Sequence, residues 1–378
     1  MKLEELILKD FRNIESLHFV PGETVNIFYG DNAQGKTNIL EAIYLLTGQR
    51  SFRQSRESDY MRFGTAQAEL TAAFFQGGRS QKAKLIFSKG TKTAYINSVP
   101  SQPSELTGLF CAVVFSPTEL ALVKEGPALR RSFLDSAISQ VMPRYLAMSA
   151  AFSRILTQRN SLLFDMARNP GMEDLLAVWD RSFAKAAYSL IHARSRYVSR
   201  IAAKAKEIYA GISGGREELG VSYSCTVSCG ERDWGEIPPG EGEKIILSAL
   251  NQMYADDIKN GFTTIGPHRD DLSIWIDDVP ARNFGSQGQQ RSCALALKLA
   301  ECSVLEEVTG EKPLLLLDDV FSELDRKRRD YLLSGIVGGQ IFITCCDRTG
   351  FRSIKNGVAA RVKAGTISGY RELGKPEQ

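Results

Sequence analysis

An eight-residue segment near the N-terminus has the residue types and spacing of a phosphate-binding loop. The segment Gly-Asp-Asn-Ala-Gln-Gly-Lys-Thr, residues 30–37, matches the pattern G-x-x-x-x-G-K-[ST]. It follows an apolar stretch predicted as a strand, 24–29, and opens an apolar-periodic stretch predicted as a helix, 36–48. Its two glycines permit a backbone turn that points successive N–H groups at phosphate oxygens. The segment therefore predicts a nucleotide site.

The residues of this loop have separate roles in the predicted site. Lys36 places a positive charge near the β- and γ-phosphates and is a candidate catalytic residue, while the Thr37 hydroxyl can ligate Mg²⁺. The nucleotide and the metal are expected to be ATP and Mg²⁺. The predicted nucleotide-binding residues of the loop are Gly30, Asp31, Asn32, Ala33, Gln34, Gly35, Lys36 and Thr37.

A second segment, Leu-Leu-Leu-Leu-Asp-Asp-Val-Phe-Ser-Glu-Leu-Asp at 314–325, places two acids after an apolar run. Four leucines fit a strand buried on both faces, and α/β sheets bind ligands at the carboxyl ends of such strands. Asp318 would hold Mg²⁺, and Asp319 could orient or deprotonate the attacking water. The alternative is that these acids cap the following helix, with Ser322 as a candidate N-cap.

A third segment, Ser-Gln-Gly-Gln-Gln-Arg at 286–291, is a serine–glycine turn that leads into a helix with an apolar face. Such a turn can bind phosphate, although it lacks the lysine of the first segment. A phosphate-binding loop covers one side of a triphosphate, so the turn of a second, identical chain could cover the other side. This predicts an ATP-driven, head-to-tail homodimer. The alternative is an ordinary helix N-cap by Ser286.

The elements that position these segments are expected to form an α/β core split by a helical insertion. We predict the N-terminal part of the head, a mixed sheet plus a β-meander, over 1–115 and a helical lobe with connecting segments over 116–260. Alternating strands and helices over 261–378 predict the C-terminal part of the head. A long helix is expected over 172–212, but it lacks a strict heptad pattern, which favours a short lobe over a coiled-coil arm.

Composition narrows the class of protein and its location. The chain has 378 residues, of which 43% are hydrophobic and 24% charged, as in ordinary globular proteins. Its early residues mix charge into every turn, and no apolar run is long enough to span a bilayer, so we expect a cytoplasmic protein with no membrane partner. Seven cysteines without paired zinc spacing predict free thiols.

Nucleic-acid contacts would have to come from a local basic patch, because the net charge is only +3. Arg50, Arg53 and Arg56 follow the predicted phosphate-loop helix at intervals of three, and Arg130 and Arg131 lie at the root of the helical lobe. We expect these arginines to contact a duplex backbone, because no aromatic ladder interleaves with them. A solvated loop is an equal alternative for the first three residues, and pairing with acids for the other two.

The order of these motifs resembles the ATP-binding-cassette (ABC) ATPase superfamily. Four segments, 8–14, 266–271, 286–292 and 315–325, are similar within it to the RecF family of bacterial recombination mediators, in the SMC-related branch. The resemblance covers essentially the whole chain. It implies a split ABC-type P-loop ATPase head with an inserted helical lobe.

The resemblance also implies an activity and partners. The expected protein is a weak, DNA-stimulated ATPase whose ATP-bound homodimer clamps DNA at double-strand/single-strand gaps or junctions. It would work with a RecR-type mediator to promote recombinase loading in recombinational repair, replication-fork maintenance and the SOS response. Slow hydrolysis would reset the clamp.

Several residue roles come from the resemblance alone. Asp325 falls on the loop that crosses the dimer interface, and Arg12 is expected to reach the nucleotide from the first strand. The residues that fall on the signature acting in trans are Ser286, Gly288 and Gln289.

The sequence also departs from the wider superfamily. Asp319 stands where most cassettes have glutamate, which fits slow turnover, and Ser116 stands where a glutamine is expected. The position of a γ-phosphate-sensing histidine reads Cys345–Cys346–Asp347.

Two other classes of protein share part of the pattern. The nucleotide-binding subunit of a transporter has all three ATP motifs, but the segment 266–271, the basic helical lobe and the absent switch histidine argue against it. A P-loop kinase or GTPase would leave the serine–glycine turn without a role, and no N-K-x-D motif is apparent.

Overall fold

The computed structural model describes residues 1–53, 55–167, 171–335, 338–346, 354 and 356–373, with the backbone alone for 333–335. The chain divides into two compact units. The first unit comprises residues 1–121 and 294–378, and the second unit comprises residues 122–293. Their boundary falls inside helix α9, Gln287–Thr309.

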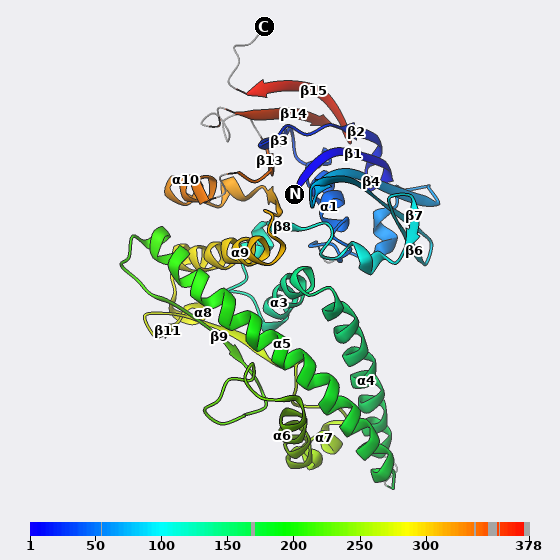
Figure 1. Cartoon of the computed structure of the whole chain (residues 1–378), viewed down its shortest axis with the longest axis vertical. Coiled ribbons are helices and arrows are strands. Elements are labelled where there is room, and N and C mark those ends of the chain that lie inside the picture. The colour runs from blue at the N-terminus through cyan, green and yellow to red at the C-terminus, as the bar shows by residue number, and fades with distance from the viewer. Residues whose placement is uncertain (54, 168–170, 336–337, 347–353, 355, 374–378) are drawn as a thin grey trace. The chain divides into compact units, whose positions relative to one another are not determined.

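One six-stranded sheet of the first unit is antiparallel, with the order β2-β1-β4-β5-β6-β7 (Figure 1). Consecutive strands β4 to β7 pair with one another, which confirms the predicted meander. Buried and more exposed residues alternate along most of β4 and β5, so one face of these strands is buried and the other is more exposed. The strands are β1 Lys2–Phe11, β2 Ile14–Phe19, β4 Gln67–Gln76, β5 Arg79–Ser88, β6 Thr91–Ile96 and β7 Val99–Ser101.

The other six-stranded sheet of this unit has the order β15-β14-β3-β13-β12-β8 and is parallel except for β15. All residues of β12 and β13 are buried, as the leucine run predicted for the former. Because parallel strands end at the same edge, the segments that follow β3, β12 and β13 meet there. The strands are β3 Val25–Tyr29, β8 Ala112–Phe115, β12 Leu314–Asp318, β13 Ile341–Cys345, β14 Gly357–Lys363 and β15 Thr366–Leu373.

Helix α1, Lys36–Leu45, contacts strands of both sheets, including β1 and β12. Its buried Leu40 belongs to the same apolar cluster as Leu8 of β1 and Leu316 of β12. The helix that begins at the phosphate-binding loop is therefore fixed from two sides. The other short helices of this unit are η1 Glu57–Tyr60, η2 Pro103–Leu106, α2 Pro117–Leu120, η3 Val320–Ser322 and α10 Arg326–Gly335.

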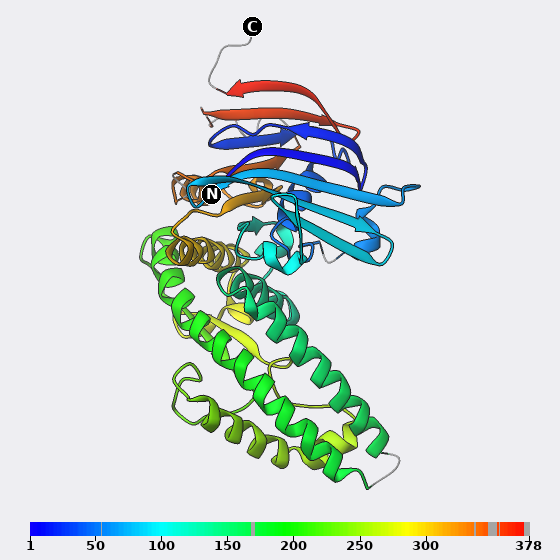
Figure 2. The same ribbon diagram turned by 45° about the vertical axis from the view of Figure 1, so that its right-hand side comes forward.

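The second unit is built around α5, Glu173–Ser213, a helix of 41 residues that confirms the predicted long helix. It packs against α4, Arg144–Met166, and α6, Pro239–Gln252 (Figure 2). Buried Arg159 binds Asp180 and Asp257, which ties α4 to α5 and α7. The remaining elements are α3 Pro127–Val141, β9 Leu219–Ser224, α7 Tyr254–Asn260, β10 Asp271–Ile276, β11 Val279–Pro280 and α8 Ala281–Phe284.

Residues 261–293 group with the second unit, although the sequence had assigned them to the C-terminal part of the head. The physical reason is strand pairing, because β10 pairs along its length with β9 in a three-stranded sheet. An alternation of strands and helices predicts the elements but does not tell which sheet a strand joins.

Two sequence-based expectations concern the chain as a whole. All seven cysteines are free, as predicted. Among the residues that the structure describes, no helix combines the length and apolar character needed to cross a membrane.

Candidate nucleotide and DNA site

The predicted phosphate-binding loop joins β3 to α1 in a strained backbone conformation. Gly30, Ala33 and Gly35 have positive φ angles of 148°, 63° and 105°. A Cβ atom at Gly30 would lie 2.4 Å from the carbonyl oxygen of Val362, and one at Gly35 would lie 2.7 Å from Oδ1 of Asn13. Gly30 is therefore required by a backbone neighbour as well as by its φ angle, and Gly35 by its φ angle.

Lys36, the first residue of α1, folds back over the loop. Its Nζ donates to the carbonyl oxygens of Gly30 at 2.6 Å and Asp31 at 2.8 Å, and the residue is only 8% exposed. An ammonium group has three donors, so one remains for a phosphate oxygen. The loop thus holds its positive charge at the place where the sequence predicts the phosphates.

The rest of the loop is held in place by neighbouring strands. Ala364 and Gly365 form the turn between β14 and β15. The N–H of Ala364 donates to the side-chain oxygen of Gln34, and the N–H of Gly365 donates to the backbone carbonyl oxygen of Gln34. The Asn32 side chain accepts from Sγ of Cys346, just after β13. Such contacts preorganise the loop, which reduces the ordering that a bound phosphate would require.

The paired acids meet this loop at the edge of the parallel sheet. Thr37 Oγ1 and Thr344 Oγ1 each donate to Oδ1 of Asp318 at 2.8 Å. Thr344 also accepts from the N–H of Asp319 at 2.9 Å. The phosphate-binding loop after β3, Thr344 of β13 and the two acids at the end of β12 therefore lie next to one another.

Asp319 differs from Asp318 in exposure, and its pKa is raised. Asp318 is 8% exposed, whereas Asp319 lies at the surface with a left-handed backbone, φ 53°. Partial burial and, second, the negative charge of Asp318 raise the pKa of Asp319, while Lys36 opposes the shift. A raised pKa makes a carboxylate a better proton acceptor.

The oxygen atoms of this cluster fit a Mg²⁺ ion. Mg²⁺ takes oxygen ligands and needs few from the protein, because substrate phosphates and waters complete its coordination. Thr37 and Asp318 supply a hydroxyl and a carboxylate 2.8 Å apart. The described part of the chain contains no group of three or more His, Cys, Asp or Glu residues that could hold a metal by itself. The donor set therefore suits an ion that arrives with a nucleotide.

The serine–glycine turn lies in the second unit, at the start of α9. Ser286 N–H donates to Oε1 of Gln289 at 2.8 Å, and Gln289 N–H donates to Oγ of Ser286 at 3.2 Å. This capping box is the helix N-cap that the sequence left open as the alternative. It uses a lone pair of Ser286, so the hydroxyl hydrogen is available to another acceptor. Gln289 is held further by Glu217, to which its Nε2 donates at 2.9 Å.

The helix that follows the paired acids, α10, has a different N-cap residue from the candidate Ser322. Ser322 Oγ donates to the carbonyl oxygen of Asp319, and α10 starts only at Arg326. Asp325 is the N-cap, because its Oδ1 accepts from the N–H of Arg328 at 2.9 Å. Asp325 is also exposed, and its role at a dimer interface stays a prediction.

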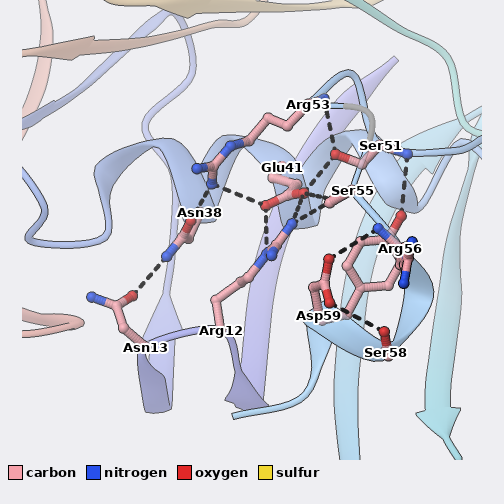
Figure 3. A network of polar contacts seen from close by, with 11 residues as sticks. Arg12, Asn13, Asn38, Glu41, Ser51, Arg53, Ser55, Arg56, Ser58 and Asp59 are labelled. Atoms are coloured by element: carbon pink, nitrogen blue, oxygen red, sulfur yellow. Dashed lines mark hydrogen bonds and ion pairs between the residues drawn. The ribbon is translucent and has the colours of Figure 1, made fainter. Parts of the chain in front are cut away.

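Arg12 lies beside α1 and contacts Glu41 rather than the phosphate loop (Figure 3). Its Nε and Nη2 donate to the two oxygens of Glu41 at 3.0 and 2.6 Å, and the guanidinium lies over the ring of Tyr60. Its predicted contact with a nucleotide stays a prediction.

The first three candidate DNA-binding arginines are on the surface of the first unit. Arg50, Arg53 and Arg56 are all exposed, in the segment that follows α1. Arg53 Nη1 donates to Oδ1 of Asn38 at 2.7 Å and lies 3.4 Å from Oε2 of Glu41.

Arg130 is a correction to the predicted DNA contacts. It is 3% exposed, and its guanidinium binds both carboxylate oxygens of Asp271, at 2.7 and 2.8 Å, as well as the carbonyl oxygen of Glu125. A buried guanidinium with these partners cannot reach a DNA backbone. Arg131 is half-buried and donates to the carbonyl oxygen of Asp270. The structure therefore agrees with the alternative given for Arg130, which was pairing with an acidic side chain.

The sequence analysis missed three residues that contact predicted site residues, namely Thr344, Asn38 and Glu41. Thr344 ends an apolar strand, and its position beside Asp318 follows only from the parallel pairing of β12 with β13. Asn38 and Glu41 are three residues apart on α1, but nothing in the sequence tells that they face the arginine segment. Ser116, at the place of the missing glutamine, caps α2 by accepting from Glu119 N–H. Asp347 lies outside the described residues.

Comparison with known proteins places this geometry in a family. Residues 2–368 match the model of the RecF/RecN/SMC N terminal domain. The chain is 38% identical to the DNA replication and repair protein RecF of Ruminiclostridium cellulolyticum, over 94% of this chain and 95% of that protein. It is 39% identical to RecF of Lactobacillus delbrueckii subsp. bulgaricus, over 92% and 91% of the two chains.

Solved structures agree in fold. The recombination mediator protein RecF in the RecFOR pathway, solved as RecF-ATPrS, superposes with a TM-score of 0.90 at 33% identity, covering 97% of each chain. An Smc head bound to the C-winged helix domain of ScpA has a TM-score of 0.56 at 16% identity, covering 99% of this chain and 98% of that one, which shows the shared fold alone. These likenesses confirm the predicted split ABC-type head with its helical lobe. The chain belongs to the RecF family of DNA replication and repair proteins.

Proposed function

We propose that this protein is an ATP-dependent DNA-binding protein of recombinational repair and replication-fork maintenance. The observation that carries the proposal is the cluster of Thr37, Asp318, Thr344 and Asp319 beside the phosphate-binding loop. A loop of this type with paired acids at the adjacent strand end suits a nucleoside triphosphate with Mg²⁺. Two relatives support ATP as that nucleotide, since RecF structures are described as RecF-ATPrS and RecF-ATP.

The residues of this cluster have separate roles in the proposed hydrolysis of ATP. Lys36 and the loop N–H groups bind the phosphates, and Thr37 and Asp318, which are hydrogen-bonded to each other, would hold a Mg²⁺ ion that would neutralise charge on the phosphate oxygens. Asp319, with its raised pKa, accepts the proton of the attacking water. Thr344 fixes both acids. Aspartate at this position is shorter than the glutamate of most cassettes, which suits the slow, DNA-stimulated hydrolysis that we propose.

A second copy of the chain completes the site in this proposal. The Ser286 hydroxyl hydrogen and the helix N-terminus behind it can bind a phosphate that belongs to the partner's nucleotide. Gly288 allows close approach, and Gln289 is already fixed by Glu217. Asp325, exposed after the paired acids, would contact the partner. Hydrolysis removes the γ-phosphate contact, so the head-to-tail dimer opens.

DNA is the proposed ligand of the ATP-bound dimer. The exposed residues Arg50, Arg53 and Arg56 offer guanidinium groups for backbone phosphates, at a gap or a double-strand/single-strand junction. The RecF neighbours are described as recombination mediators in the RecFOR pathway. By analogy we place this chain in the cytoplasm, with a RecR-type partner in recombinase loading. The alternative of a transporter subunit finds no support, since the chain belongs to the RecF family.

Lys36→Arg tests the proposal. The larger guanidinium cannot keep both contacts with the carbonyl oxygens of Gly30 and Asp31, so ATP turnover and ATP-dependent DNA binding should fall together. Lys84→Arg, on β5 and paired with Glu69, is the matched control. The measurements are the ATPase rate and the dissociation constant for a gapped duplex with and without ATP. A parent protein whose DNA affinity does not respond to ATP would contradict the proposal.

A further inference from the structure

Glu41 is a fully buried carboxylate at the centre of a network of polar contacts on α1 (Figure 3). One oxygen, Oε1, accepts from Nη2 of Arg12 at 2.6 Å and from the hydroxyls of Ser51 at 2.5 Å and Ser55 at 3.2 Å. The other, Oε2, accepts from Nε of Arg12 at 3.0 Å and lies 3.4 Å from Nη1 of Arg53. Arg12 and the serines satisfy this carboxylate without help from Arg53.

Arg53 is therefore the partner that Glu41 can release. Its contact with Glu41 is the longest of the contacts that Glu41 makes in this network, and its side chain is 43% exposed, against 16% for Arg12. Glu41 contributes one carboxylate, and Arg12 and Arg53 contribute two guanidinium groups, so these three side chains together carry a net positive charge. A backbone phosphate could take the outward donors of Arg53 and leave the buried charge of Glu41 paired with Arg12.

A chain of side-chain hydrogen bonds leads from Arg53 to the phosphate-binding loop (Figure 3). Arg53 donates to Asn38 Oδ1 at 2.7 Å, Asn38 Nδ2 donates to Asn13 Oδ1 at 2.8 Å, and Asn13 Nδ2 reaches the carbonyl oxygen of Ala33 at 3.5 Å. Asn13 also packs against Gly35, where a Cβ would lie 2.7 Å from its Oδ1. The loop and the arginine segment are thus connected through partly exposed side chains.

We propose that Asn38 and Glu41 are positioning residues that couple nucleotide occupancy of the phosphate-binding loop to the DNA-contacting position of Arg53. The inference rests on the proposed ATP-dependent DNA binding. Both residues are on the helix that carries Lys36 and Thr37, so a change at the loop reaches them directly. By linkage, DNA bound at Arg53 changes nucleotide affinity by the same factor.

The test is the ratio of DNA affinities with and without nucleotide. The probe is a fluorescent gapped duplex, titrated with and without a saturating non-hydrolysable ATP analogue. Asn38→Ala should lower the DNA affinity with the analogue, divided by the DNA affinity without it, by about fivefold, the scale of one side-chain hydrogen bond. The affinity for the analogue without DNA should stay unchanged. Glu41→Gln should lower the ratio in the same direction, and Ser58→Ala, which loses only a bond to Asp59, is the matched control.

A double-mutant cycle separates positioning from a merely structural role. Arg53→Ala should weaken DNA binding, and Asn38→Ala should then have no further effect in that background. A ratio in Asn38→Ala equal to that of the parent would overturn the inference. An Asn38→Ala effect that persists in full without Arg53 would overturn it too. A parent whose own ratio is one would instead overturn the proposed function, and the coupling with it.

Discussion

Thr344 donates a hydrogen bond to Asp318 through Oγ1 at 2.8 Å, and the same oxygen accepts from the N–H of Asp319 at 2.9 Å. One hydroxyl on β13 thus fixes both acids at the end of β12. Thr344 is 1% exposed, so water cannot replace either bond without rearrangement. The paired acids are positioned by a residue from a strand that contains neither of them.

Thr344→Val should reduce the ATPase rate about 30-fold. The change keeps the shape of the side chain and removes both bonds, each worth about 1 kcal/mol. Because the loop around Lys36 is untouched, nucleotide affinity should change less than kcat. Steady-state kinetics and a direct binding titration measure the two effects. Thr71→Val, on β4, is a matched control that should leave both unchanged.

Asp319→Asn should lower the ATPase rate by at least ~100-fold while ATP still binds. The amide keeps the size of the side chain but cannot accept the proton of water. Lys36, Thr37 and Asp318 stay in place, so a titration with labelled ATP should resemble that of the parent. Asp277→Asn, in the turn after β10, is the control. A rate equal to that of the parent would show that Asp319 is not the base.

The ATPase rate should fall on acidification at a higher pH than an ordinary aspartate would give. Burial and the charge of Asp318 raise the pKa of Asp319, so its base form is lost as pH falls through that raised value. A pH profile of kcat measures the acidic limb. The limb should disappear in the residual activity of Asp319→Asn. A limb at the pH of an unperturbed carboxyl group would contradict the assignment.

Replacing Arg50, Arg53 and Arg56 together by alanine should reduce the slope of DNA affinity against salt. Each backbone phosphate contact contributes about 0.9 to the logarithmic slope, so three contacts contribute about 2.7. Fluorescence titrations over a range of salt concentrations provide the slope. An unchanged slope would mean that these exposed residues do not touch DNA.

Arg130→Met is the contrasting variant for that experiment. It should leave the salt slope unchanged and lower the free energy of unfolding by about 2–4 kcal/mol, because it strands the carboxylate of Asp271. The lower part of this range is reasonable because the Asp271 side chain is 28% exposed. Denaturant unfolding measures the loss.

Much of the site was predictable because its residues are close in sequence and chemically distinctive. The segment from Gly30 to Thr37 and the acids Asp318 and Asp319 combine unusual spacing with strand and helix patterns. The family resemblance implied a role for Asp325 at a dimer interface, which stays a prediction; the residue is exposed and is the N-cap of α10.

The rest depended on contacts between distant segments. Thr344 contacts Asp318 only because β13 lies between β3 and β12 in the sheet. The order of strands in a sheet cannot be predicted from the local sequence pattern of any one strand. The sequence left DNA contact and pairing with acids open for Arg130, and its partner, Asp271, is 141 residues away. Charge alone does not distinguish a solvated guanidinium from a paired one.

Sedimentation velocity with saturating Mg·ATP and a gapped duplex tests the central claim, that two copies complete each other's nucleotide sites. The parent should sediment as a dimer with ATP and as a monomer without it. Ser286→Arg should bind ATP but remain a monomer, while Ser104→Arg, at an exposed position of η2, should dimerise like the parent. A parent that stays monomeric under these conditions, or a Ser286→Arg variant that dimerises normally, would contradict the account.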